Sequence, residues 1–138
     1  MKYLFDTCML SEINHPKGNR SVKRYAAGLP QDDVFISAVS MGEIAKGLAA
    51  MDEGARKRKI SQWMQEILEY NSSQVLEVTV DVAMLWGELS AKLQKQGQHL
   101  HMADGLIAAT AISHGLHVVT RNIGDFEPTG ALIVNPWR

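Results

Sequence analysis

The sequence contains one cysteine, no long hydrophobic run and no large excess of charge of either sign. Cys8 alone cannot form an internal disulfide, and no stretch approaches the ~20 apolar residues of a membrane-spanning helix. The chain begins in a strand-like run, with no signal-peptide pattern. A formal net charge of −1 gives no compositional argument for nucleic-acid binding and does not exclude it. These absences predict a cytoplasmic protein without a membrane segment.

The patterns that are present predict one domain over residues 1–138, with 46% hydrophobic residues to supply its core. Short apolar runs alternate with helical periodicity, which indicates parallel strands joined by right-handed helical crossovers. The expected architecture is an α/β fold, a three-layer α/β/α sandwich around a parallel sheet of four to five strands. Predicted strands cover 2–5, 34–36, 75–78, 118–119 and 132–134; predicted helices cover 7–14, 19–27 (alternatively an irregular loop), 40–50, 56–70, 81–96 and 101–114.

Four acidic residues fall where strands end or helices begin. Asp6 ends the first strand, and Glu43 opens the helix that follows the second. Asp104 lies in the first turn of a helix that is apolar nearly all round, and Asp125 follows the fourth strand. In an open parallel sheet these places share one edge, where ligands bind. Clustered carboxylates repel one another unless a divalent cation compensates, and oxygen ligands suit Mg²⁺ or Mn²⁺. The cluster therefore favours a metal-dependent nuclease.

Each acid also has a purely structural interpretation. Asp6 and Asp125 could be turn residues, and Asp104 could cap its helix or complement the helix dipole. Glu43 completes a Ser40-x-x-Glu43 capping box, in which it would satisfy a backbone N–H and do nothing else. The joint placement of all four favours a site over these separate explanations.

Other polar residues carry weaker signals. The basic run at 56–59 predicts a solvated helix face, with RNA phosphate binding as the functional alternative. His99 and His101 are expected to be surface or capping histidines, because their spacing does not place them on one helical face.

Four segments together resemble the PIN domain, and more closely the VapC-type toxins of bacterial toxin–antitoxin pairs. These are Leu4-Phe5-Asp6-Thr7, Ser40-x-x-Glu43-Ile44-x-x-Gly47, the stretch from Ala103 to Ala111, and Thr120-Arg121-Asn122 with Asp125-Phe126. The resemblance spans nearly the whole chain. One departure is Gly105, where Ala or a larger residue is common; glycine there costs about 1 kcal/mol against alanine in a helix interior.

The resemblance implies a Mg²⁺- or Mn²⁺-dependent endoribonuclease. Asp6, Glu43 and Asp104 would be its main metal ligands and Asp125 the fourth acid, with Thr7, Thr120 and Asn122 lining the same pocket. It also implies a homodimer, inhibited by a small antitoxin that carries a DNA-binding domain and inserts its C-terminal segment into the cleft.

The expected chemistry is hydrolysis by a metal-activated water, which attacks in line and leaves a 5′-phosphate. The RNA itself, whether transfer, ribosomal or messenger, is left open. Two other classes stay open as well. One is a catalytically weak PIN-like module that acts only through its antitoxin complex. The other is a phosphoacceptor signalling domain, against which the single Asp6 and the lack of a matching lysine argue.

Overall fold

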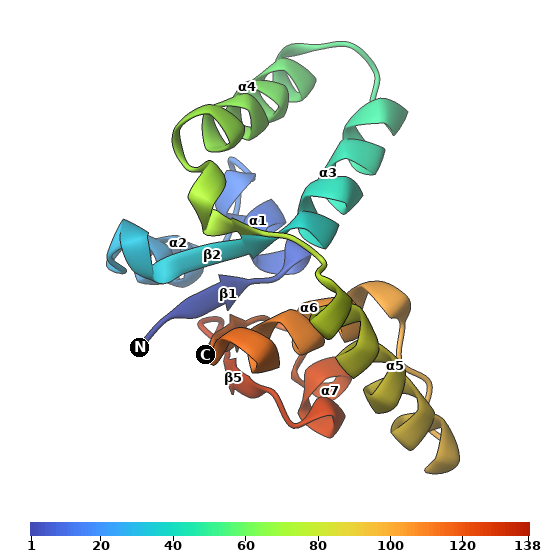
Figure 1. Cartoon of the computed structure of the whole chain (residues 1–138). Coiled ribbons are helices and arrows are strands. Elements are labelled where there is room, and N and C mark those ends of the chain that lie inside the picture. The colour runs from blue at the N-terminus through green and yellow to red at the C-terminus, as the bar shows by residue number, and fades with distance from the viewer.

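Five parallel strands form the centre of the computed structural model, which describes all residues 1–138 (Figure 1). The strand order is β3-β2-β1-β4-β5, so the first strand of the chain lies in the middle of the sheet. The strands are β1 (Tyr3–Phe5), β2 (Val34–Ser37), β3 (Val75–Leu76), β4 (His117–Val119) and β5 (Leu132–Val134). The predicted parallel sheet is confirmed.

Seven helices connect and cover the strands. They are α1 (Thr7–Asn14), α2 (Arg20–Ala27), α3 (Ala38–Ala50), α4 (Ala55–Tyr70), α5 (Val80–Lys95), α6 (Met102–His114) and α7 (Ile123–Phe126). The segment 19–27, for which a loop was the alternative, forms a helix with Asn19 as its N-cap. None of the helices is long and apolar enough to span a membrane.

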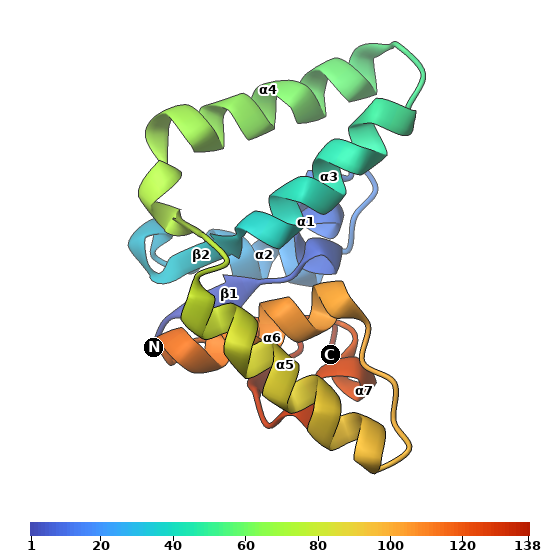
Figure 2. The ribbon, with the colours of Figure 1, turned by 45° about the vertical axis from the view of Figure 1, so that its right-hand side comes forward.

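The alternating side chains of the central strand divide the core into two halves. Phe5 contacts a cluster that includes residues of α1, α2 and α4, whereas Leu4 packs with α6 on the opposite face. Helix α5 lies outside α6 and crosses it, which Figure 2 shows. Helices therefore cover both faces, and the three-layer α/β/α arrangement is confirmed.

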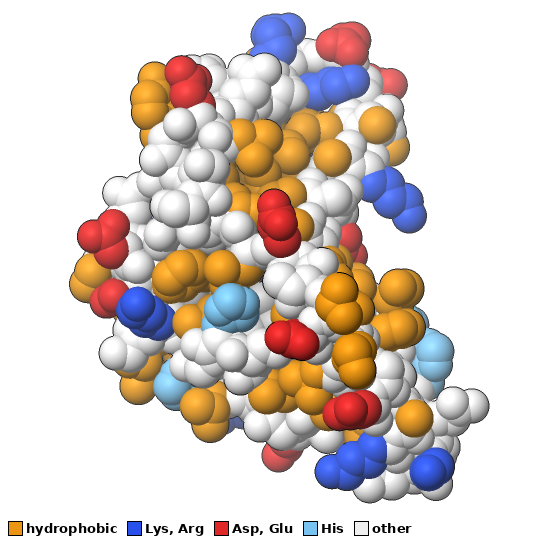
Figure 3. Space-filling view, viewed as in Figure 1, with side chains coloured by type: hydrophobic (Ala, Val, Ile, Leu, Met, Phe, Trp, Pro, Cys, Tyr) orange, Lys and Arg blue, Asp and Glu red, His pale blue; other side chains and the backbone are white.

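Helices α3 and α4 form an arm that rises from the sheet (Figure 2). Hydrophobic side chains gather between these two helices on the face drawn in Figure 3. Trp63, Met64 and Ile67, which repeat at helical spacing in α4, belong to the core on this side of the sheet. The arm is thus attached through α4 as well as through the start of α3.

Strand β3 is shorter than the predicted 75–78. Only Val75 and Leu76 pair with β2, opposite Ile36 and Ser37. Because β2 ends at Ser37 and β3 is an edge strand, residues 77–78 have no partner for their backbone groups and lead into α5.

Gly105 is explained by the indole of Trp86, which packs directly on the start of α6. A Cβ added at Gly105 would lie 2.6 Å from Trp86 Cδ1 and 3.0 Å from Leu100 Cδ2. The rigid ring cannot withdraw without disturbing the packing of α5 on α6. We expect Gly105→Ala to lower the midpoint of thermal unfolding, although alanine favours a helix by about 1 kcal/mol.

A matched control for this prediction is Gly87→Ala within α5. No atom lies within 4 Å of a Cβ added there, so the same substitution should stabilise the protein. Thermal melts of both variants measure the difference, and equal stabilisation by both would contradict the packing argument.

Candidate active site

Asp6 is a buried carboxylate at the carboxyl end of the central strand. It is the N-cap of α1, where its Oδ1 accepts a hydrogen bond from the Met9 backbone N–H at 2.8 Å. Its Oδ2 accepts from the Thr120 hydroxyl at 2.5 Å. Thr120 follows β4, so the pairing of β4 with β1 brings together two residues that are 114 positions apart. Both carboxylate oxygens are therefore held in place, and the side chain is only 3% exposed.

Burial raises the pKa of Asp6 from its ordinary 3.8 to about 6. The hydrogen bonds from Thr120 and Met9 oppose that rise, whereas the negative charges of Asp104 and Glu43 add to it. Asp6 thus interacts electrostatically with two of the other predicted site acids.

Glu43 does not complete a capping box, so this structural interpretation is wrong. Helix α3 begins at Ala38, two residues before the predicted start, because Ser37 is the N-cap and accepts from the Val39 N–H. Glu43 instead accepts a hydrogen bond from the Thr7 hydroxyl, and its side chain is exposed to solvent. The helix does not need this carboxylate for its start.

Ser40 was not predicted as a residue of the site. It is fully buried, and its hydroxyl lies 3.0 Å from that of Thr7, with which it is hydrogen-bonded. Thr7 therefore links α1 to two residues of α3. No signal in the sequence predicts this contact, apart from the place of Ser40 in the Ser40-x-x-Glu43 segment.

Asp104 and Asp125 lie close to each other on α6 and α7. Burial, and then the charges of Asp125 and Glu43, raise the pKa of Asp104, whereas His101 lowers it. Asp104 is not a helix cap, because His101 holds the N-cap position. Asp125 lies within the short helix α7 rather than in a turn, so the turn interpretation is also wrong. Both carboxylates lie in the first turn of their own helix, which agrees with the dipole interpretation of Asp104, and neither forms a cap hydrogen bond.

The predicted supporting residues divide into two kinds. Thr7 and Thr120 hydrogen-bond directly to site carboxylates. Asn122 contributes backbone groups and not its side chain, which is exposed. Its N–H donates to the Thr120 hydroxyl at 2.9 Å, and its carbonyl accepts from the Asp125 N–H at 3.1 Å.

The donor chemistry of the cluster fits a hard divalent cation. None of the four carboxylates is paired with a lysine or arginine, since the one ion pair of the structure joins Lys57 to Glu53 on the arm. With the side chains in these positions, however, no group of three or more Asp, Glu, His or Cys residues encloses a site for a metal ion. The oxygen ligands are gathered at one edge of the sheet, and Glu43 is hydrogen-bonded to Thr7.

A largely apolar cavity of about 290 Å³ adjoins the site at Glu43. Thr7 and Glu43 line its end near the site, and α1, α3 and α4 form its walls through Leu10, Ile44, Leu48, Ile60 and Trp63. This cavity runs from the site along the inner side of the arm.

Comparison with known proteins identifies the family of this chain. The PIN domain model matches residues 3–129. The VapC ribonuclease Y4jK of Sinorhizobium fredii is 33% identical over 97% of this chain and 96% of its own length. Toxin FitB of Neisseria gonorrhoeae is 32% identical over 97% of both chains. A chain in the structure of FitAB bound to an IR36 DNA fragment superposes with a TM-score of 0.90 and 31% identity, covering 99% of this chain and 96% of that one. The chain therefore belongs to the PIN domain family, among the VapC-type toxins of toxin–antitoxin systems.

Proposed function

We propose that this protein is a metal-dependent endoribonuclease toxin of the bacterial cytoplasm, which a cognate antitoxin neutralises. The observation that carries the proposal is the set of carboxylates of Asp6, Glu43, Asp104 and Asp125, which lack a basic partner, at the edge of the sheet where ligands bind. A relative that is 33% identical over nearly the whole chain is named a VapC ribonuclease, which supports RNA as the substrate.

Asp6, Glu43 and Asp104 would hold Mg²⁺ or Mn²⁺, and Asp125 would complete the set. The bound ion would supply an acidified water and charge neutralisation at the scissile phosphate. The protein contributes rigid placement of the ligands. The Thr120 hydroxyl and the Met9 N–H fix both oxygens of Asp6, while Thr7 orients the Glu43 carboxylate.

Hydrolysis by water needs no nucleophile from the protein. Cys8 is the one thiol of the chain, and burial raises its pKa above the ordinary value. A thiol that stays protonated is a poor nucleophile. The expected product therefore carries a 5′-phosphate and no covalent enzyme intermediate forms.

The partner is an antitoxin with a DNA-binding domain. FitAB, whose toxin chain superposes on this protein, is bound to a DNA fragment in its structure. We assign the apolar cavity along the arm to a segment of the antitoxin, because it is hydrophobic and ends at Thr7 and Glu43. An occupant of this cavity would reach the carboxylates and block access of RNA to them.

Loss of Asp104 should abolish both metal binding and cleavage. Calorimetric titration of Mn²⁺ into wild type should give a binding isotherm that Asp104→Asn lacks, and labelled RNA should be cut only by the wild type with metal present. Equal affinity of both proteins for Mn²⁺ would refute the ligand assignment. Metal binding without RNA cleavage would instead identify a module that acts only through its antitoxin complex.

We also expect a homodimer. Most apolar residues of α4 and α5 pack within one subunit, but Val80, Met84 and Met102 on α5 and α6 are 60–75% exposed. Exposed apolar patches of this kind mark interaction surfaces.

Light scattering should give a mass twice the 15.3 kDa of one chain, and Met84→Glu should reduce the measured mass to that of one chain. Leu132→Glu, at an equally exposed residue of the edge strand β5, is the control that should remain dimeric. A wild type of monomer mass at micromolar concentration would contradict the expectation.

A further inference from the structure

Two hollows flank the loop between α5 and α6, next to the carboxylate cluster. One, of about 370 Å³, lies between this loop and α7 and is lined by Gln98, His99 and Asp125 among others. The other, of about 520 Å³, lies against α5 and includes Trp86 and Gln94. Gln98, His99 and Leu100 line both hollows. Each volume falls in the range of about 300–1,000 Å³ that is typical of small-ligand sites.

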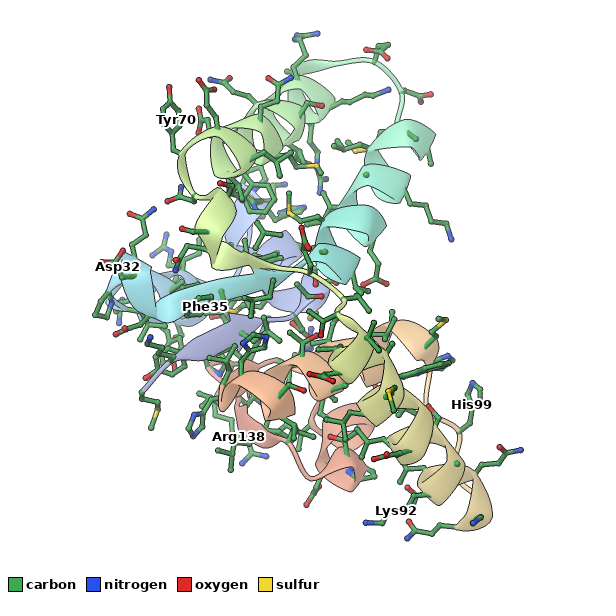
Figure 4. All side chains as sticks on the ribbon, viewed as in Figure 1. Asp32, Phe35, Tyr70, Lys92, His99 and Arg138 are labelled. Carbon is green, nitrogen blue, oxygen red and sulfur yellow. The ribbon has the colours of Figure 1, made fainter.

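The loop that separates the hollows is anchored to the fold. Gly97 has a φ of 73°, which allows the sharp turn after α5, and the Gln98 N–H donates to the Leu93 carbonyl at 2.9 Å. Leu100 packs beside Gly105 at the start of α6. The side chains of Gln98 and His99 thus extend from a tethered segment, and Figure 4 shows His99 projecting from it.

The chemistry of the lining excludes one class of occupant and favours another. Neither hollow is lined by a lysine or arginine, and Asp125 would repel a phosphate group. Carboxamides and an imidazole are what a nucleobase needs, because its edges form hydrogen bonds and its faces stack on aromatic rings. The occupant indicated by the lining is therefore neutral, flat and rich in hydrogen-bonding groups.

The imidazole of His99 has a defined orientation. Its ring meets that of His101 edge to face, with the ring centroids 4.8 Å apart and an interplanar angle of 87°. His101 in turn precedes Asp104 by one helical turn. An edge-to-face contact covers at most one face of one of the two rings. Ring faces of these histidines are therefore available for stacking beside the carboxylate cluster.

We infer that Gln98 and His99 form a nucleobase subsite, in which an unpaired base of the RNA stacks on His99 and is read by the Gln98 carboxamide. The inference rests on the proposed ribonuclease function and adds a source of sequence preference to it. The hollow between the loop and α7 shares Asp125 with the carboxylate cluster. A base held there therefore belongs to a nucleotide close to the cleaved bond.

Binding can be tested without any cleavage. In NMR titrations of the full chain with the four ribonucleoside 5′-monophosphates, at least one should shift the Gln98 side-chain amide and His99 ring signals, and ribose 5-phosphate should not. His99→Ala should weaken this binding about tenfold, the usual effect of losing a stacking ring. His114→Ala, an exposed histidine at the other end of α6, and Gln65→Ala on α4 are matched controls that should bind like wild type. Shifts of equal size with ribose 5-phosphate, or no shift with any nucleotide, would overturn the subsite.

A cleavage assay separates this inference from the proposed function. On a pool of short single-stranded RNAs, the Gln98→Ala/His99→Ala variant should cut at a different set of sites from wild type, while both controls keep the wild-type pattern. An active double variant with the wild-type pattern would overturn the subsite and leave the ribonuclease intact. A wild type that cuts no RNA would overturn the proposed function, and the nucleotide titration would still decide the subsite.

Discussion

Glu43→Gln should reduce metal-dependent RNA cleavage by orders of magnitude while changing the free energy of unfolding by less than about 1 kcal/mol, because substitutions of exposed side chains usually have small effects on stability. Glutamine keeps the size of the side chain and an oxygen that can accept the hydrogen bond from Thr7. It loses the negative charge that a bound cation needs. The start of α3 is unaffected, since Ser37 caps it.

Thermal melts and a cleavage assay on the same preparation test this expectation. Glu53→Gln removes the same charge from an exposed residue that is paired with Lys57 on the arm, and it should keep wild-type cleavage. Retained cleavage by Glu43→Gln would leave the metal to Asp6, Asp104 and Asp125.

Asp6→Asn should stabilise the protein in the absence of metal and abolish its activity. In the folded protein the pKa of Asp6 is raised to about 6, so the proton binds more tightly there than in the unfolded chain. The contribution of Asp6 to stability is therefore fully present below pH 3.8 and is lost as the pH rises through about 6. Asparagine cannot ionise and still caps a helix well, so without metal at pH 7 the variant should be more stable by about 3 kcal/mol.

Chemical denaturation in the presence of a chelator, at pH 4 and pH 7, measures this difference. The advantage of Asp6→Asn should be small at pH 4 and large at pH 7. Added Mn²⁺ should stabilise the wild type and leave the variant unchanged, because only the wild type gains from binding the ion. An advantage independent of pH would show that ionisation of Asp6 is not its cause.

The sequence predicted the sheet and the place of the acids because both depend on local signals. Apolar runs of two to four residues located the strands, and the small apolar residues on nearly all sides of α6 located the buried helix. What the sequence could not show depends on neighbours far along the chain. Strand β3 stops at Leu76 because its partner stops, and the start of α3 is set by Ser37, whose capping role competed with that of Ser40.

The sequence also could not show why residue 105 is a glycine. Helix propensity alone suggested a loosened helix start, whereas the structure shows a close approach of Trp86 from α5. Ser40 is a similar case, and for Thr120, which the resemblance already placed in the pocket, only the hydrogen bond to Asp6 was missing from the prediction. Each hydroxyl contacts a residue that follows a different strand, and no spacing along the chain encodes such a pair.

The central place of the first strand has a consequence for translation. Asp6 is among the first residues to be synthesised, but Thr120, which holds its carboxylate, and the whole of β4 come more than 100 residues later. At about 5–20 residues per second, the ribosome needs on the order of 5–25 seconds to supply them. A nascent or prematurely terminated chain that lacks β4 lacks one of the two strands that pair with β1, and it also lacks Asp125. Such a chain cannot form the complete proposed site, so the proposed RNA cleavage would begin only when synthesis is nearly finished.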